Sequence, residues 1–267
     1  MGAAPAAVNA PAVLPIRPPE LHDPAVRTVR LHYPDPLASG DEVAVGDDDA
    51  RYLTRVLRLP VGADLVLFDG RGGEYDATIV TAGRREVTVA VGEHRAVERE
   101  SPLAITVAQG ISRGERMDHV VQKTTELGAA AIVPLLCERG VVRLDDKRAA
   151  ARLEHWQRVA ASACRQCGRN RLPQIAPITA LEEWLAAPPA GLRLVLTPDA
   201  ADRLTGLPRP ATPVTLLVGP EGGLTAQETE AAEAAGFRAV GLGPRILRTE
   251  TAAVAGVAAL QTLWGDL

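Results

Sequence analysis

From residue 103 onward, short and almost continuously apolar segments alternate with longer segments whose apolar residues recur every three or four positions. A strand that is apolar throughout has no face for water, which is typical of a parallel sheet covered by helices on both sides. The pattern therefore predicts an α/β fold with a parallel sheet. Its strands are expected at residues 103–108, 130–136, 192–197, 214–218 and 239–242.

Residues that favour helix starts and stops separate these strands. Thr225 and Glu228 form a capping box, in which the hydroxyl and the carboxylate bond free N–H groups of the first helical turn. Gly236 is well placed to end that helix, because glycine readily takes the left-handed conformation there. Further helices are expected at 115–127, which Gly128 ends, at 147–164, and in a short stretch that Thr179 caps.

Two loops follow the last two predicted strands, and each contains glycine, proline and a carboxylate before a helix begins. The first is Gly219-Pro220-Glu221-Gly222-Gly223, and the second runs from Leu242 to Ala252. Glycine lets a ligand approach the backbone closely, and proline stiffens the connection. Such loops at the carboxyl ends of parallel strands bind ligands through backbone groups. Ordinary strand-to-helix turns are the alternative, because glycine and proline are common in all turns.

The first part of the chain has a different pattern. An Ala- and Pro-rich stretch at residues 1–25 is expected to be a disordered extension. Short alternating segments then predict strands at 27–33, 63–68, 74–80 and 86–91, and hence a small β-barrel over residues 26–100. Glu100-Ser101-Pro102 marks the start of the α/β domain, residues 101–267.

A short helix is expected at residues 48–57, within the predicted barrel. Arg51, Arg55 and Arg58 are spaced three and four apart, so they would lie on one face of this helix. That face could bind RNA phosphates, or it could simply face solvent.

The composition limits the partners of the protein. A formal net charge of −4 and an aromatic content of 3% exclude bulk positive charge or an aromatic platform as the means of holding RNA, so any RNA contact must be local. No apolar run is long enough for a membrane helix, and the N-terminus lacks the basic start of a signal peptide. The expected location is the cytoplasm.

Several common sites are absent from the sequence. It contains no P-loop, no complete dinucleotide fingerprint and no Gly-x-Ser-x-Gly nucleophile. Cys137, Cys164 and Cys167 are an odd and sparse set, and the single C-x-x-C lacks a second pair or a nearby histidine. Buried thiols are therefore expected, and no metal site.

Both loops resemble those of the ribosomal RNA small subunit methyltransferase E family, which belongs to the SPOUT knotted methyltransferases. The resemblance extends to 53–59, to 122–128 and to 166–169, and it covers most of the chain from Val26 onward. It implies methylation of uridine N3 in 16S ribosomal RNA with S-adenosylmethionine (SAM), acting on the 30S subunit. It also implies a PUA-like barrel, a C-terminal trefoil knot and a homodimer, for which the Ala- and Gly-rich segment 252–259 could pack against the partner or within its own domain.

The same resemblance implies which residues contact the cofactor. They are Leu196, Thr197, Gly219, Pro220, Glu221, Gly222, Gly223, Leu242, Gly243, Leu247, Arg248, Thr249, Glu250 and Ala252.

Arg248 and Glu221 are the predicted catalytic residues. Uracil N3 is a weak acid, and a guanidinium nearby would lower its pKa by stabilising the anion. Arg248 is the candidate for this role. Glu221 could anchor the cofactor or accept the N3 proton. Alternatively, Arg248 and Glu250 could pair with each other or cap the last helix.

Gln166 and Arg169, at the end of the long predicted helix, are expected to approach RNA. Arg165 departs from the family, in which this position is more often acidic, so no carboxylate role transfers to it. Attraction of arginine to a helix C-terminus is the alternative explanation. Two other functions stay open: a noncatalytic assembly factor, and a methyltransferase for another RNA nucleotide.

Overall fold

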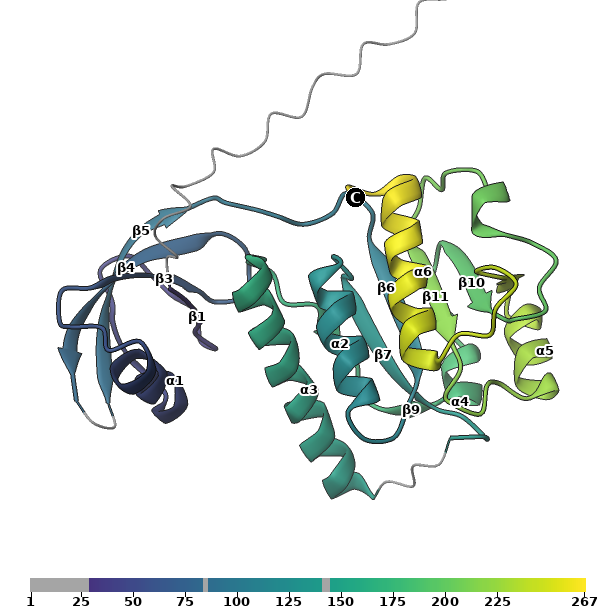
Figure 1. Cartoon of the computed structure of the whole chain (residues 1–267), viewed down its shortest axis with the longest axis horizontal. Coiled ribbons are helices and arrows are strands. Elements are labelled where there is room, and N and C mark those ends of the chain that lie inside the picture. The colour runs from purple at the N-terminus through teal and green to yellow at the C-terminus, as the bar shows by residue number, and fades with distance from the viewer. Residues whose placement is uncertain (1–28, 84–85, 141–144) are drawn as a thin grey trace, which may run out of the picture.

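The computed structural model describes residues 29–83, 86–140 and 145–267, which form two sheets with their helices (Figure 1). A five-stranded N-terminal sheet lies at one end of the molecule, and a seven-stranded sheet with helices on both faces forms the remainder. The expected extension at residues 1–25 lies outside the described residues. None of the helices in the described ranges is long and apolar enough to cross a membrane.

The N-terminal sheet has the strand order β1-β3-β4-β5-β2. Alternate residues of its long strands are buried, as a curled sheet with an enclosed core requires, and Leu31, Leu53, Leu67 and Ile79 fill that core. Its elements are β1 (Arg30–His32), β2 (Glu42–Val45), α1 (Asp47–Arg51), the π-helix η1 (Tyr52–Val56), β3 (Asp64–Phe68), β4 (Glu74–Ala82) and β5 (Val87–Arg95).

Two details of this sheet differ from the prediction. Strand β2 was not expected, because its sequence Glu-Val-Ala-Val is only four residues long, and pairing with β5 stabilises it. The expected helix at 48–57 begins as an α-helix and continues as a π-helix, which ends before Arg58. Arg58 has a φ of 54°, which takes the chain out of the helix.

The C-terminal sheet is parallel throughout, with the order β12-β10-β11-β6-β7-β8, and β9 pairs with β7. All of the predicted apolar strands are present. The strands are β6 (Ile105–Gly110), β7 (Ala131–Leu136), β8 (Gln174–Ile175), β9 (Thr179–Ala180), β10 (Leu192–Leu196), β11 (Val214–Val218) and β12 (Arg238–Val240).

Helices cover both faces of this sheet, which explains why its strands are apolar throughout. Leu216 of β11 packs with Val257 on one side, whereas its neighbour Leu217 packs with Ala232 on the other. The helices are α2 (Arg116–Glu126), α3 (Asp146–Cys167), α4 (Leu181–Leu185), α5 (Ala226–Ala234) and α6 (Thr249–Trp264), with a 3-10 turn η2 (Leu204–Gly206).

One of the two predicted caps is confirmed. The Thr225 hydroxyl accepts from the backbone N–H of Glu228 at 3.1 Å, and the Glu228 carboxylate accepts from the backbone N–H of Thr225 at 2.8 Å, as a capping box requires. Thr179 does not cap α4. It belongs to β9, the N-cap residue is Ala180, and the Thr179 hydroxyl instead bonds the Glu183 side chain at 3.1 Å.

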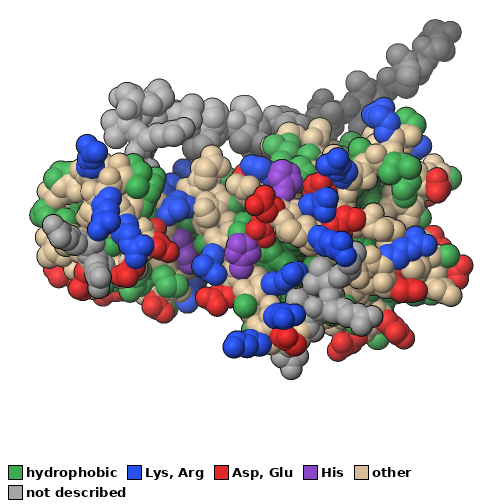
Figure 2. Space-filling model, turned by 60° about the horizontal axis from the view of Figure 1, so that its bottom comes forward, with side chains coloured by type: hydrophobic (Ala, Val, Ile, Leu, Met, Phe, Trp, Pro, Cys, Tyr) green, Lys and Arg blue, Asp and Glu red, His purple; other side chains and the backbone are tan. Residues whose placement is uncertain are grey.

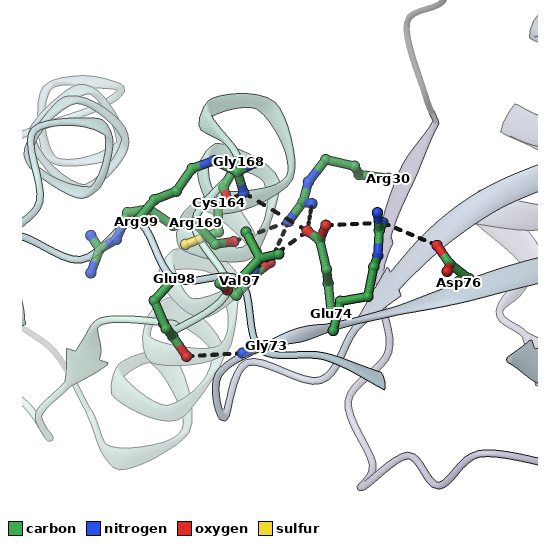
Figure 3. Close-up of polar contacts among 12 residues, drawn as sticks. Arg30, Gly73, Glu74, Asp76, Val97, Glu98, Arg99, Cys164, Gly168 and Arg169 are labelled. Carbon is green, nitrogen blue, oxygen red and sulfur yellow. Dashed lines mark hydrogen bonds and ion pairs between the residues drawn. The ribbon is translucent and has the colours of Figure 1, made fainter. Parts of the chain in front are cut away.

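A buried polar network joins the N-terminal sheet to the residues that follow α3. Glu74 is 4% exposed, and it pairs with Arg30 and with Arg95, the latter at 3.0 Å. Arg30 and Glu74 point toward each other in Figure 3. The Arg30 guanidinium also donates to the Asn170 side chain at 2.6 Å, and Asn170 donates to the carbonyl of Val97 at 2.6 Å. The N-terminal sheet and the residues after α3 therefore meet through largely buried charged and polar groups that bond one another.

Candidate functional site

The two glycine-containing loops lie side by side at the carboxyl ends of β11 and β12, where they line one cavity of about 1060 Å³. This is the edge at which a parallel sheet usually binds its ligand. Every residue that the sequence assigned to the cofactor lines this cavity: Leu196, Thr197, Gly219, Pro220, Glu221, Gly222, Gly223, Leu242, Gly243, Leu247, Arg248, Thr249, Glu250 and Ala252.

Two glycines of the first loop are required by its shape. Gly223 has a φ of +70°, a conformation that other residues rarely adopt. At Gly219, a Cβ atom would lie 2.8 Å from the backbone nitrogen of Leu224, so a side chain there would force the loop open. The loop consequently presents its backbone to the cavity.

A buried hydrogen-bond network ties the two loops together. The Thr249 hydroxyl, at the start of α6, donates to the carbonyl oxygen of Gly219 at 2.6 Å. Gln109 is fully buried at the end of β6, and its Nε2 donates to Thr249 Oγ1 at 2.9 Å and to Gly219 O at 3.3 Å. Sequence reasoning did not identify Gln109. The available signal was a polar residue directly after the predicted strand at 103–108.

Glu221 is held by groups from another part of the chain. Its Oε1 accepts from the backbone N–H of Arg113 at 2.8 Å and from Arg116 Nη1 at 2.9 Å. Partial burial raises the pKa of Glu221, but the backbone hydrogen bonds and the Arg116 guanidinium outweigh this effect, so the pKa lies below its ordinary value. Near neutral pH, Glu221 is therefore ionised, and its Oε1 already accepts two hydrogen bonds.

Glu250 lies deeper in the site, with 16% of its side chain exposed. Its Oε1 is 3.8 Å from Arg116 Nε, and its Oε2 is buried without a hydrogen-bond partner among the residues described. Buried carboxylate oxygens are normally bonded, so Oε2 is available to a donor from a ligand. Sequence reasoning missed Arg116, which contacts both carboxylates.

Arg248 is exposed and occupies the N-cap position of α6, but its side chain makes no capping bond. The ion pairs of the described residues do not include one between Arg248 and Glu250. Neither structural alternative for Arg248 is therefore seen among the described residues, and Arg248 is one of the residues that line the cavity.

The residues predicted to bind RNA fall into two groups. Arg51, Arg55, Arg58 and Gln166 are exposed, although Arg51 lies within 4 Å of two acidic residues of its own helix, at 3.5 and 3.8 Å. Helix α1 and the cavity elements lie at opposite ends of the molecule in Figure 1.

Arg169 differs from this expectation. It is 3% exposed, and its guanidinium bonds Glu100 at 2.5 Å and the carbonyls of Thr125 and Ala129 at 2.7 and 3.0 Å. All of its strong contacts are within the protein, so its position indicates a structural role.

The cysteines are free thiols. Burial raises the pKa of Cys137 and of Cys164 to about 12. Within the described ranges, no group of three or more His, Cys, Asp or Glu side chains is placed to hold a metal ion.

Two family matches cover most of the described chain. An RNA methyltransferase domain matches residues 99–261, and an RNA methyltransferase PUA domain matches residues 45–92. Among curated proteins, the ribosomal RNA small subunit methyltransferase E of Buchnera aphidicola is 30% identical over 89% of this chain and 94% of its own length. The protein of the same name from Synechocystis is 36% identical over 79% of this chain and 70% of its own length.

Solved structures agree with these matches. A ribosomal RNA small subunit methyltransferase E from Neisseria gonorrhoeae, bound to SAM, superposes with a TM-score of 0.83 and 41% identity, covering 90% of this chain and 99% of that one. A Legionella pneumophila protein, also solved with SAM, gives a TM-score of 0.86 and 37% identity over 91% of this chain and 100% of that one. The chain therefore belongs to the RNA methyltransferase family of the ribosomal RNA small subunit methyltransferase E proteins.

Proposed function

We propose that this protein transfers a methyl group from SAM to N3 of one uridine in 16S ribosomal RNA, and that its substrate is the assembled 30S subunit. The observation that carries the proposal is the meeting of both loops in one cavity, with a free guanidinium and a free carboxylate oxygen at the same place. The substrate places the enzyme in the cytoplasm.

The cavity suits SAM in size and chemistry. Its volume of about 1060 Å³ lies at the upper end of ordinary ligand pockets, so a target base has room beside the cofactor. Backbone groups of the loops around Gly219 and Leu242 would hold the adenosine and the methionine parts. The unpartnered Oε2 of Glu250 suits a ligand ammonium or hydroxyl. When bound, SAM supplies a methyl group already activated by its sulfonium.

The protein must therefore activate the acceptor nitrogen. Uracil N3 carries a proton near neutral pH, and its lone pair is then delocalised into the two neighbouring carbonyl groups, so loss of the proton is needed to make N3 nucleophilic enough to form the new N–C bond. A guanidinium within about 4 to 6 Å favours the ionised base. We assign this role to Arg248, which lines the cavity and whose side chain has no hydrogen-bond or ion-pair partner among the described residues. The N3 proton passes to solvent.

Glu221 serves as an anchor in this proposal. A carboxylate with a lowered pKa and two donors already on one oxygen is a poor proton acceptor. By holding Arg113 and Arg116, Glu221 instead keeps the first loop against the start of α2.

One side of the segment 252–259 packs within its own domain. Gly256 faces its own sheet, where a Cβ would lie 2.7 Å from Leu216 Cδ2, and Val257 is fully buried. The family resemblance still leads us to propose a homodimer and a trefoil knot. Exposed Leu263 and Ile246, at 38% and 86%, are apolar surface that a partner chain could cover. Light scattering tests the dimer.

The experiment that tests the function is methylation of unmodified 30S subunits, followed by digestion and mass spectrometry of the nucleosides. One 3-methyluridine per 16S RNA is expected. Arg248→Ala should lower the methylation rate by about a hundredfold or more while SAM still binds in calorimetry. Arg209→Ala, an exposed arginine in the loop before β11, is the control and should retain the rate. Methylation at another atom, or an unchanged rate in Arg248→Ala, would contradict the proposal or this role.

A further inference from the structure

The outer side of α3 carries basic residues that the proposed function does not use. Lys147, Arg148, Arg152 and Arg158, here called the α3 stripe, occur between the first turn and the middle of this helix. Glu154 is the acidic residue among them. The whole chain has a net charge of −4, so this concentration of positive charge runs against its overall balance.

The packing of α3 explains why the stripe faces outward. Trp156 and Ala160 are buried against α2 and the sheet, with exposures of 2% and 1%. Lys147 and Arg158 lie on the opposite side and are exposed, while Arg148, which is exposed, and Arg152, which is half-buried, lie at the flank. Arg148 and Arg152 are four positions apart and stand next to each other, so the cations line the flank and the outer side of the helix.

These cations are poorly neutralised by the protein itself. Arg148 lies 3.5 Å from Asp145 of its own cap but has 75% of its side chain exposed. Across the described ranges, Lys147, Arg152 and Arg158 have no acidic partner within 4 Å. His155, next to them, is held by Asp118 at 2.8 Å. Free, exposed guanidinium groups are suited to phosphate oxygens.

The course of α3 connects the methylation site with the N-terminal sheet. The helix follows β7, and in Figure 1 its first turn lies on the lower side of the molecule, the side at which β7 ends. Arg139, shortly after β7, lines the cavity. The last turn of α3 reaches α1, where Arg165 pairs with Asp49 at 2.8 Å. A helix of 22 residues is about 33 Å long. Figure 1 shows the path of α3. Figure 2, turned so that the lower side of Figure 1 comes forward, shows several Lys and Arg side chains in the middle of that view.

We propose that the α3 stripe binds the phosphate backbone of the ribosomal RNA strand that enters the methylation cavity. This inference rests on the proposed function, because it takes RNA as the substrate. The stripe supplies the local positive charge that an acidic protein needs in order to hold RNA. Its groups would contact phosphates alone, so the stripe would not distinguish one base sequence from another.

The test uses charge reversal in the full-length protein. Arg158→Glu and Arg152→Glu are compared with Arg209→Glu, an exposed arginine in the loop before β11, at the opposite edge of the sheet. Affinity for unmodified 30S subunits and for deproteinised 16S RNA is measured by filter binding at several salt concentrations. SAM affinity and the unfolding temperature are measured for each variant. If Arg152→Glu is unstable, the Arg158→Glu variant alone decides the test, because Arg158 is exposed.

We expect each stripe reversal to weaken 30S binding by roughly fivefold to tenfold and to reduce the salt slope by about one, as loss of a phosphate contact does. SAM affinity and the unfolding temperature should stay at wild-type values. If both variants match Arg209→Glu in affinity and in slope, the inference is wrong. If only 30S binding weakens and binding to free RNA does not, the partner is an acidic protein and the RNA assignment is overturned.

Failure of the proposed function would look different. A wild-type protein that binds 30S subunits through the stripe but forms no 3-methyluridine would contradict the function and leave this inference standing. A protein that methylates normally with the stripe reversed would contradict the inference alone.

Discussion

The hydroxyl of Thr249 donates to the carbonyl oxygen of Gly219 across 2.6 Å, which joins the first residue of α6 to the loop after β11. Residues 30 positions apart in the chain thereby fix the relative position of the two cavity loops. The buried side chain of Gln109 donates to both Thr249 and Gly219, so the contact lies inside the protein.

Thr249→Val keeps the shape of this side chain and removes its hydroxyl. Because Gly219 O loses a donor and Gln109 loses an acceptor in a buried place, the free energy of unfolding should fall by about 1 to 3 kcal/mol. SAM affinity should fall as well, since the loops are no longer joined. Urea unfolding and calorimetry measure the two effects. Thr262→Val is the control, because Thr262 is an exposed residue of the same helix; equal losses in both variants would rule out a specific role for the loop contact.

Glu74→Gln tests the network between the two sheets. Removing the carboxylate charge leaves Arg30 and Arg95 buried or partly buried without a counter-ion, which should cost about 3 to 5 kcal/mol of stability at pH 7. Denaturant unfolding measures the loss. Asp76→Asn is the matched control: Asp76 also pairs with Arg95, at 3.1 Å, but it is 55% exposed, so its loss should cost at most about 1 kcal/mol.

The pH dependence of the same network has a definite sign. Burial raises the pKa of Glu74, but the hydrogen bond and charge of Arg30 and the charge of Arg95 outweigh it, so the pKa lies below its ordinary value of 4.5. A carboxyl group whose pKa is lowered by folding stabilises the protein above the unfolded value, and this stabilisation is lost as the pH falls through the folded value. The difference between wild type and Glu74→Gln should therefore be constant at neutral pH and shrink below about pH 4.5. A difference that grows in acid would contradict this assignment.

Arg169→Lys should destabilise the protein by a few kcal/mol, because an ammonium cannot serve Glu100 and two carbonyls in the geometry of a guanidinium. Binding of 30S subunits, measured at a temperature at which the variant is folded, should equal that of wild type. The exposed neighbour Arg171, which pairs with Glu98 at 3.2 Å, provides the control in Arg171→Lys, with an expected loss below about 0.5 kcal/mol. Weaker RNA binding at full stability would return Arg169 to the RNA-contacting residues.

Cys137 and Cys164 should react slowly with iodoacetamide at pH 8. Their pKa values of about 12 leave almost no thiolate at that pH, and Cys164 has no exposed surface. Peptide mass spectrometry after timed alkylation in native and denatured protein measures the difference. Rapid labelling of Cys164 in the native protein would show that the end of α3 opens.

The sequence was most informative where a signal is local. Almost continuous apolar strands identified the parallel sheet, and Thr225 with Glu228 marked the start of α5, because in each case the sequence signal lies within a few neighbouring residues. Both loops could be assigned to one cavity because parallel strands end at the same edge of the sheet.

Partners distant in the chain could not be inferred in the same way. Gln109 acts through Gly219 and Thr249, which are 110 and 140 residues away. Arg169 is buried because Glu100 and two carbonyls meet it in space, whereas its sequence context resembles any basic helix end. Strand β2 exists only because β5 pairs with it.

The network of Arg30, Glu74 and Asn170 has a consequence for how a target is chosen. Because separating the two sheets would leave buried charges unpaired, the network opposes any change in the span between the N-terminal sheet and the cavity. If the proposed substrate is held at the N-terminal sheet, only a nucleotide that lies at this span from the point of attachment reaches the cavity. A uridine in a suitable sequence but at the wrong distance would then stay unmethylated.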